Sequence, residues 1–266
     1  IKKRKEFFES KNFNTIYIAT PPLEHFKDIE EAIYQKKNVI CEKPIALNPK
    51  DYKFLFNMAK KNKVYLLEVC HYKHDEHFKE IKKIILKQNN KNKNETKNLY
   101  LSFKIPMLDK KNFRLDKNFE NSSLYDLGFY PLDFVCEIYK NFKIINYNYF
   151  NKNNNIYGNL KLKSAETNII ISWGIGFSYT NQLSFFTSNF FLYSNFVFTK
   201  PKKYKPVINI INKQHRKINI KFNIDKSFSN MFDEYYKILM KKNDLKYKEH
   251  SEIIIKRLKN FLKINK

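Results

Sequence analysis

Apolar and polar residues alternate over the first 70 positions in a way that predicts strands separated by helices. The short apolar runs, rich in β-branched residues, are Asn14–Ala19, Val39–Cys41 and Val64–Val69. Such runs are typical of buried strands in a parallel sheet. The segments between them repeat apolar residues at helical spacing, and Asn48-Pro49 supplies an N-cap and a first-turn proline for the second helix. This order predicts an α/β sheet wound with right-handed crossovers.

The rest of the chain predicts a second, β-rich part. A helix over Phe78–Lys87, a polar loop over Gln88–Asn98 and a strand over Leu99–Ile105 lead into it. Strand-like runs separated by Asn-rich turns follow at 143–150, 159–163, 167–177, 182–199 (one or two strands) and 206–222. Two amphipathic helices follow; Asp225-Lys-Ser227 caps the first, and the last carries Ile254, Leu258 and Phe261. We expect a large, open, mostly antiparallel sheet flanked by helices.

The formal net charge of +25 raises the question of nucleic-acid binding. Only four of the 51 basic residues are arginine, the residue favoured for bidentate phosphate and base contacts, and the lysines are spread along the whole chain. Abundant Asn, Ile, Phe and Tyr suggest a coding sequence biased towards A and T. Without a clustered basic footprint, we expect no nucleic-acid partner.

The cysteine count and the apolar tracts limit the location of the protein. Cys41, Cys70 and Cys136 are an odd number without a Cys-x-x-Cys pair, so neither a disulfide framework nor a structural zinc site is expected. The chain opens without a signal peptide, and the apolar tracts Ile169–Phe177 and Leu183–Phe198 are too short or too interrupted to span a bilayer. We expect a cytoplasmic protein without a membrane partner.

The first candidate for chemistry follows the predicted strand that ends at Cys41. Glu42, Lys43 and Pro44 come directly after it, and ligands of open α/β sheets bind just outside the carboxyl ends of strands. Proline fixes its own φ and restricts the preceding lysine to extended conformations. The alternative is an ordinary Lys-Pro turn at the surface.

The second candidate is the segment Ser122–Tyr139. Asp126 and Tyr130 lie four residues apart and would project from the same face of a helix, and Asp133 lies three residues beyond. Gly128 between them would allow a ligand or a strand to come close. The alternative is an amphipathic helix whose buried tyrosine is hydrogen-bonded to a neighbouring carboxylate.

A third candidate is a possible metal site at His71, His74 and His77. The spacing i, i+3, i+6 turns the third histidine well away from the first two on a helix, unlike the His-x-x-x-His pair of helical zinc sites. We therefore expect no metal.

Three motifs together resemble the Gfo/Idh/MocA family of NAD(P)-dependent oxidoreductases. They are Ile18-Ala-Thr-Pro-Pro22, Glu42-Lys-Pro44 and Asp126-Leu-Gly-Phe-Tyr-Pro-Leu-Asp133, and the likeness runs from about residue 12 to the C-terminus. Tyr130 places the chain nearer the branch with tyrosine, which includes glucose–fructose oxidoreductase and dimeric dihydrodiol dehydrogenase. The resemblance implies that residues 1–72 are the second half of a Rossmann domain and 73–266 a substrate-binding and dimerisation domain.

The same resemblance implies hydride transfer between NAD or NADP and a hydroxyl-bearing carbon of a sugar or sugar derivative. Tyr130 would be the acid/base, Lys43 its electrostatic partner and a hydrogen-bond donor to the substrate, and Asp126 would orient the hydroxyl. The side chains implied to line the nicotinamide side are Thr20, Pro21, His25, Glu42 and Lys43. The family likeness also implies a homo-oligomer that forms through the C-terminal sheet.

The chain departs from the family pattern at its start. No Gly-x-Gly-x-x-Gly turn precedes Ile16, and the only glycines stand at 128, 158, 174 and 176. We expect an incomplete Rossmann sheet that lacks roughly 50–60 residues of βαβ structure. The alternative function is therefore a truncated, inactive homologue that serves as a sugar-binding or dimerising module.

Overall fold

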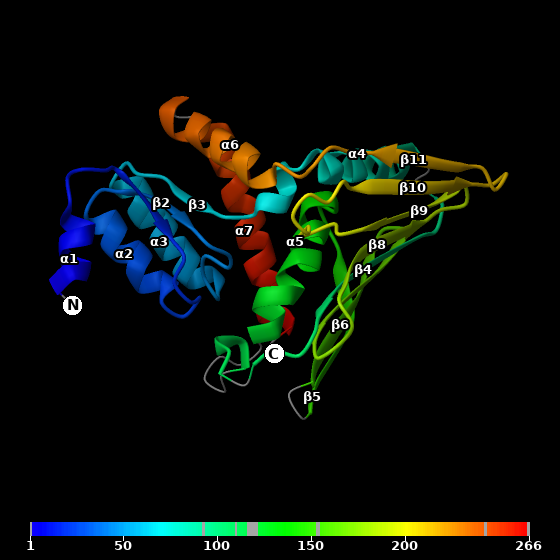
Figure 1. Ribbon diagram of the computed structural model, residues 1–266, viewed down its shortest axis with the longest axis horizontal. Coiled ribbons are helices and arrows are strands. Elements are labelled where there is room, and N and C mark those ends of the chain that lie inside the picture. The colour runs from blue at the N-terminus through cyan, green and yellow to red at the C-terminus, as the bar shows by residue number, and fades with distance from the viewer. Residues whose placement is uncertain are drawn as a thin grey trace. The chain divides into compact units, whose positions relative to one another are not determined.

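The computed structural model describes residues 2–91, 94–109, 111–115, 122–152, 155–241 and 244–264. It divides into two compact units, shown in Figure 1. Unit 1 comprises Ile1–Cys70 and Met231–Lys266, and unit 2 comprises His71–Asn230. The first boundary lies close to the predicted one at residue 72. The C-terminal helical segment differs from the prediction, because it joins unit 1 instead of the β-rich part.

Unit 1 contains a parallel sheet of three strands in the order β1-β2-β3, as predicted. Its strands are β1 (Thr15–Ile18), β2 (Asn38–Cys41) and β3 (Leu66–Glu68). Its N-terminal helices are α1 (Lys2–Glu9), α2 (His25–Tyr34) and α3 (Pro49–Lys61). The side chain of Asn48 accepts the Asp51 N–H at 2.9 Å, so the predicted N-cap of α3 is confirmed.

Side chains of the C-terminal helices close the outer edge of β3. These helices are α6 (Ser227–Lys241), whose residues from Met231 belong to unit 1, and α7 (Asp244–Ile264). Because β3 uses Tyr65 O and Val69 N to pair with β2, the N–H groups of Leu66 and Glu68 face away from the sheet. Tyr247 Oη accepts the first at 3.1 Å, and His250 Nε2 accepts the second at 3.0 Å. This explains why the segment joins unit 1.

A buried ion pair fixes the same strand to α7. Arg257 Nη2 lies 2.6 and 2.5 Å from the two carboxylate oxygens of Glu68, and the two residues are 0% and 1% exposed. Glu68 Oε1 also accepts the N–H of Ile45 at 2.9 Å. An apolar cluster from the sheet and both helices, Ile40, Leu67, Val69, Met231, Tyr235, Ile238 and Tyr247, adds to this contact.

Unit 2 contains an eight-stranded sheet in the order β11-β10-β9-β8-β4-β7-β6-β5. Only β4 and β7 pair in parallel, which confirms the predicted mostly antiparallel sheet. The strands are β4 (Lys97–Ile105), β5 (Lys143–Lys152), β6 (Asn155–Ser164), β7 (Thr167–Ile175), β8 (Thr180–Phe186), β9 (Phe190–Asn195), β10 (Val207–Asn212) and β11 (Lys217–Lys221). The run predicted at 182–199 is thus two strands.

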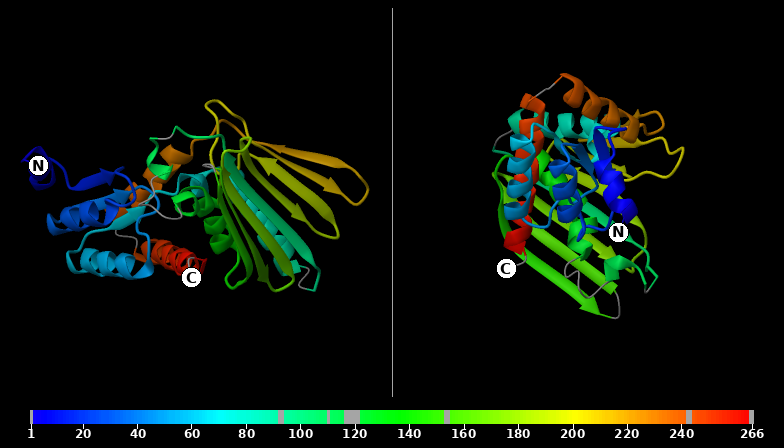
Figure 2. Two further views of the ribbon diagram at one scale, coloured as in Figure 1. Left: turned by 90° about the horizontal axis from the view of Figure 1, so that it is seen from below. Right: turned by 90° about the vertical axis from the view of Figure 1, so that its left-hand side faces the viewer.

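Two long helices of unit 2 lie against one face of this sheet, as Figure 2 shows. The helical elements are η1 (His71–His74), α4 (Glu76–Lys91), η2 (Phe113–Leu115), η3 (Leu124–Gly128) and α5 (Phe129–Ile138). Because α4 continues to Lys91 and β4 begins at Lys97, the predicted polar loop is shorter than expected. Gly128 and Gly158 both pack on Trp173, whose ring atoms would lie 2.9 and 2.2 Å from an added Cβ. These two glycines are therefore required for packing.

His77 is buried in a polar network between α4 and the sheet. Ser194 Oγ donates its one proton to Val207 O at 2.7 Å, so His77 Nε2 is the donor in its 2.7 Å contact with that oxygen. Lys200 Nζ lies 2.5 Å from Asp75, the residue that precedes α4. Burial, with a smaller contribution from Lys200, lowers the pKa of His77 to about 3. The native state therefore holds this ring neutral.

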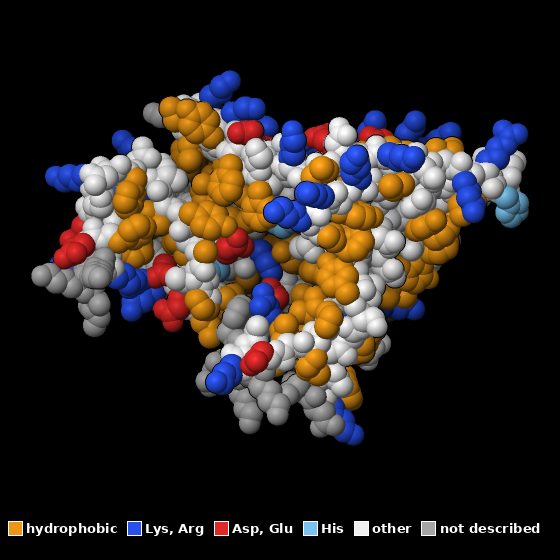
Figure 3. Space-filling view, viewed as in Figure 1, with side chains coloured by type: hydrophobic (Ala, Val, Ile, Leu, Met, Phe, Trp, Pro, Cys, Tyr) orange, Lys and Arg blue, Asp and Glu red, His pale blue; other side chains and the backbone are white. Residues whose placement is uncertain are grey.

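The basic side chains do not gather in one place. Lys and Arg are scattered over the visible face of both units in Figure 3. Among the residues described, no helix combines the length and apolar character needed to cross a bilayer, and no group of three or more His, Cys, Asp or Glu could hold a metal ion.

Replacing Arg257 with Met should lower the free energy of unfolding by about 3–5 kcal/mol, because it leaves the Glu68 carboxylate buried without its counter-charge. Chemical denaturation followed by circular dichroism measures this. The double variant Glu68→Gln/Arg257→Met should recover much of the loss, and the exposed control Lys83→Met should change stability by less than about 1 kcal/mol. An Arg257→Met protein as stable as the wild type would contradict this role.

His77 should make the protein less stable as pH falls from about 6.5 towards 3. Its folded pKa lies below the unfolded value, so the unfolded state binds more protons in this window and stability falls with pH by up to about 1.4 kcal/mol per unit. His77→Gln, which keeps a donor for Ser194, should show a shallower decline in denaturation experiments between pH 4 and 7. Identical slopes in both proteins would exclude His77 as a source of acid sensitivity.

Candidate functional site

Lys43 stands just beyond the carboxyl end of β2, where the sequence placed it. The Glu42 N–H donates to Ile18 O at 2.9 Å, so pairing with β1 continues one residue past the strand and then stops. The Lys43–Pro44 peptide is cis, and the lysine is partly exposed. Tyr17 Oη donates to the Glu42 carboxylate, and burial together with this carboxylate raises the pKa of Tyr17. Glu42 thus already has a partner in Tyr17.

His25 joins the loops that follow β1 and β2. Its ring is buried, with Nε2 2.8 Å from Thr20 O and Nδ1 2.8 Å from Pro44 O. Both contacts join a ring nitrogen to a backbone carbonyl oxygen, so the imidazole lies between the two loops and contacts both of them. Both ring nitrogens of His25 thus contact backbone carbonyl groups. These carbonyls belong to Thr20, the residue before Pro21, and to Pro44, the residue after Lys43.

Thr20 is held by a further side-chain contact. Its hydroxyl donates to Asp28 Oδ2 at 2.7 Å, and the guanidinium of Arg4 donates to the other oxygen of Asp28. Thr20, Pro21, His25, Glu42 and Lys43 thus all belong to unit 1, in or next to the two loops at the carboxyl ends of β1 and β2.

Asp126 and Tyr130 belong to unit 2, on two consecutive helical elements. Asp126 lies in the π-helical turn η3, and Tyr130 lies in the first turn of α5, so the i, i+4 pair does not share one regular α-helical face as the spacing suggested. Arg114 Nε donates to Asp126 Oδ2 at 2.5 Å. No sequence pattern indicates this arginine, because it lies twelve positions before its partner.

Tyr130 is 8% exposed and lies in an aromatic cluster. The neighbouring ring centroids lie 5.2 to 5.9 Å away and belong to Phe103, Phe129, Phe198 and Tyr72. Rings on four sides fix the position of the phenol and limit its contact with water.

A charged network that the sequence analysis did not predict adjoins this cluster. Tyr72 Oη donates to Asp133 Oδ2 at 2.7 Å, and Lys73 Nζ lies 3.0 Å from Asp133 and 2.9 Å from Glu137. Burial alone would raise the pKa of Glu137, but the ammonium groups of Lys73 and Lys82 outweigh it and hold that pKa below its usual range. The sequence does indicate one part of this network. Asp133 and Glu137 lie four residues apart, so on a helix their carboxylates lie on the same face, where a single cation can contact both.

Comparison with protein families assigns the first part of the chain. Residues 2–70 match the model of the Gfo/Idh/MocA group, described as an oxidoreductase family with an NAD-binding Rossmann fold. Residues 2–70 belong to the Gfo/Idh/MocA oxidoreductases. This confirms the recognition based on the Thr20-Pro21 and Glu42-Lys43-Pro44 motifs.

Two curated relatives are named as enzymes of a dTDP-linked sugar and of scyllo-inositol. The dTDP-3,4-didehydro-2,6-dideoxy-alpha-D-glucose 3-reductase of Actinomadura kijaniata is 23% identical over 219 residues, which cover 78% of this chain and 63% of the relative. The scyllo-inositol 2-dehydrogenase (NADP(+)) IolU of Bacillus subtilis is 35% identical over 79 residues, 30% of this chain and 24% of the relative. The chain thus spans less than two thirds of the length of either relative.

Solved structures with the same fold cover nearly the whole chain. The 3-ketoreductase KijD10 of Actinomadura kijaniata, in complex with NADP and TDP-benzene, superimposes with a TM-score of 0.83 at 20% identity, over 95% of this chain and 77% of KijD10. The UDP-N-acetylglucosamine 3-dehydrogenase GnnA of Acidithiobacillus ferrooxidans gives a TM-score of 0.66 at 13% identity, over 94% and 77%. These likenesses establish that the chain has the fold of these two enzymes.

Replacing His25 with Ala should loosen both loops, because it removes the ring that lies between them and takes the hydrogen-bond donor from a buried carbonyl oxygen, at a cost of about 1–3 kcal/mol. Hydrogen exchange measured by mass spectrometry should show faster exchange around residues 20–24 and 43–47, with the helix α3 unchanged. Tyr34→Ala, at an exposed position on the same helix, is the matched control and should leave both loops as they are. Unchanged loop exchange in His25→Ala would contradict this positioning role.

Proposed function

We propose that this chain acts as an NAD(P)-dependent oxidoreductase that transfers hydride between the nicotinamide and a hydroxyl-bearing carbon of a sugar or sugar derivative. The main support is the position of Lys43 directly after β2, within a segment that belongs to the Gfo/Idh/MocA oxidoreductases. The relatives that reduce or oxidise nucleotide sugars and inositol support the same substrate class.

The residues of unit 1 fit the nicotinamide end of the cofactor. Thr20, Pro21, Glu42 and Lys43 lie at the carboxyl ends of two parallel strands, where dinucleotides bind in such sheets. None of the four glycines lies in unit 1, and those at 128 and 158 pack on Trp173, so these 266 residues contain no glycine turn for the pyrophosphate. When bound, NAD or NADP would supply the hydride or accept it.

The proposed roles of the chain's own residues follow from their chemistry. Tyr130 would remove the proton of the substrate hydroxyl or return it, and Lys43 would stabilise the phenolate by its positive charge and donate a hydrogen bond to the substrate. Asp126 would orient the sugar hydroxyl, and its contact with Arg114 keeps its carboxylate in one place. For His25, which was first expected to line the cofactor, we propose the positioning of the Thr20 and Lys43 loops.

We further propose that two copies associate through the outer face of the eight-stranded sheet. Exposed aromatic side chains follow neighbouring strands there, with the rings of Phe186 and Phe191 stacked 4.3 Å apart and Tyr100 5.7 Å from Phe186. Such an apolar surface is stabilised when a second copy covers it.

We also propose a cytoplasmic location. The three cysteines are free and buried, as suits a protein in a reducing compartment.

The alternative function, an inactive sugar-binding or dimerising module, is less well supported. It would explain a chain without the glycine turn, but Lys43, Asp126 and Tyr130 have all been retained. Binding of a sugar without any binding of cofactor would favour this alternative.

Fluorescence titration with NADPH and NADH should give saturable binding, weakened in Lys43→Ala. With a panel of dTDP-sugars, UDP-N-acetylglucosamine and scyllo-inositol, Tyr130→Phe should then lower kcat by about 10²–10⁴-fold, because the acid/base is lost. Cofactor affinity of Tyr130→Phe should equal that of the wild type. The control Tyr236→Phe, at an exposed position, should keep full activity. No binding of either cofactor up to about millimolar concentration would refute the proposal for this chain.

A further inference from the structure

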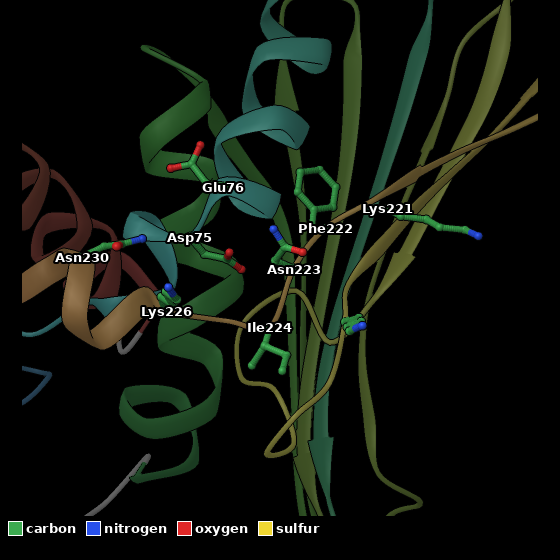
Figure 4. Close-up of a pocket in the computed structure, with 9 residues that line it drawn as sticks. Asp75, Glu76, Lys221, Phe222, Asn223, Ile224, Lys226 and Asn230 are labelled. Atoms are coloured by element: carbon green, nitrogen blue, oxygen red, sulfur yellow. The ribbon is translucent and has the colours of Figure 1, made fainter.

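Unit 2 contains a cavity of about 740 Å³ that the proposed chemistry does not use. Figure 4 shows it where the start of α4 meets the end of β11 and the segment that leads into α6. The residues that line it are Asp75, Glu76, Lys205, Lys221, Phe222, Asn223, Ile224, Lys226 and Asn230. All of them belong to one unit, so the cavity is complete within unit 2.

Both carboxylates of the cavity are neutralised by lysines that do not line it. Asp75 lies 2.5 Å from the buried ammonium of Lys200, and the exposed Glu76 lies 2.7 Å from the exposed ammonium of Lys79. Among the residues that the structure describes, no carboxylate lies within ion-pair distance of the other three lysines, at positions 205, 221 and 226. The lining therefore carries an excess of positive charge.

The surroundings of these lysines favour an anion further. Lys226 immediately precedes α6, whose N-terminus carries a partial positive charge, and the Asp225 carboxylate there accepts the N–H and the hydroxyl of Ser227, at 2.7 and 3.0 Å. In Figure 4 the side chains of Asp75, Asn223 and Lys226 lie near one another, and the long side chain of Lys221 extends away from them.

Two lining residues of the segment after β11 are apolar. Phe222 packs edge-on against His77, with ring centroids 5.4 Å apart, and Ile224 is 46% exposed. The cavity thus offers ammonium groups for charge and an aromatic ring for the organic part of a ligand.

We propose that this cavity binds a small organic phosphate of the nucleoside diphosphate class. Lysine is a point-charge donor suited to phosphate, and the volume falls in the range of pockets for ligands of this size. Phe222 provides a face on which a base can stack. The inference does not depend on oxidoreductase activity, because none of these residues takes part in the proposed hydride transfer.

Isothermal titration of the 266-residue chain with uridine diphosphate and with inorganic pyrophosphate tests this site. The triple variant Lys205→Gln/Lys221→Gln/Lys226→Gln should bind both probes at least about tenfold more weakly than the wild type. The control Lys50→Gln/Lys53→Gln/Lys61→Gln removes the same charge from α3 and should stay within about twofold. Equal losses in the two triple variants, or no binding by the wild type at about 10 mM probe, would overturn the proposal.

Lysine acetylation followed by mass spectrometry locates the site independently. Uridine diphosphate should protect Lys205, Lys221 and Lys226 from acetylation and leave Lys53 as reactive as before. Protection of Lys43 alone would place the probe at the strand ends of unit 1 and would refute this cavity as its site. NADPH affinity of the cavity triple variant should equal that of the wild type, which separates this site from the proposed oxidoreductase function.

Discussion

The buried contact between Glu68 and Arg257 is the constraint on which unit 1 depends. A strand of three residues at a sheet edge would leave its outward N–H groups without acceptors, and the C-terminal helices supply those acceptors through Tyr247 and His250. The ion pair is buried, so loss of either partner would leave the other charge without compensation. One oxygen of the same carboxylate, Oε1, also accepts the N–H of Ile45.

That second contact connects stability with the proposed chemistry. The loop that carries Lys43 is held on one side by Glu68 through Ile45 N and on the other by His25 through Pro44 O. A lysine that must act on a substrate needs a backbone that does not move, and two buried side chains provide it. The position of Lys43 thus depends on His25 and Glu68, and through Glu68 on Arg257 near the end of the chain.

The turn that opens unit 2 is fixed by charge in a comparable way. Lys73 pairs with Asp133 and Glu137 of α5, whereas Asp75, two residues later, pairs with Lys200 from the segment after β9. In the first pair the turn supplies the cation, and in the second it supplies the anion. Because an exchange of partners would bring like charges together, the two pairs favour one arrangement of the turn, of α4 and of α5. Tyr130 sits in the aromatic cluster beside the first pair, and the phosphate cavity lies beside the second.

The sequence by itself determined the parallel sheet of unit 1, the Asn48 cap, the large mixed sheet and the place of Lys43 after β2, because periodicity, capping and strand ends are local properties. Only the tertiary structure decided that the last helices complete unit 1, that η3 is a π-turn, and that His25 binds two loops. It also decided that Arg114 meets Asp126 and that Lys200 neutralises Asp75. These features depend on contacts between different elements of the fold, so no local pattern encodes them.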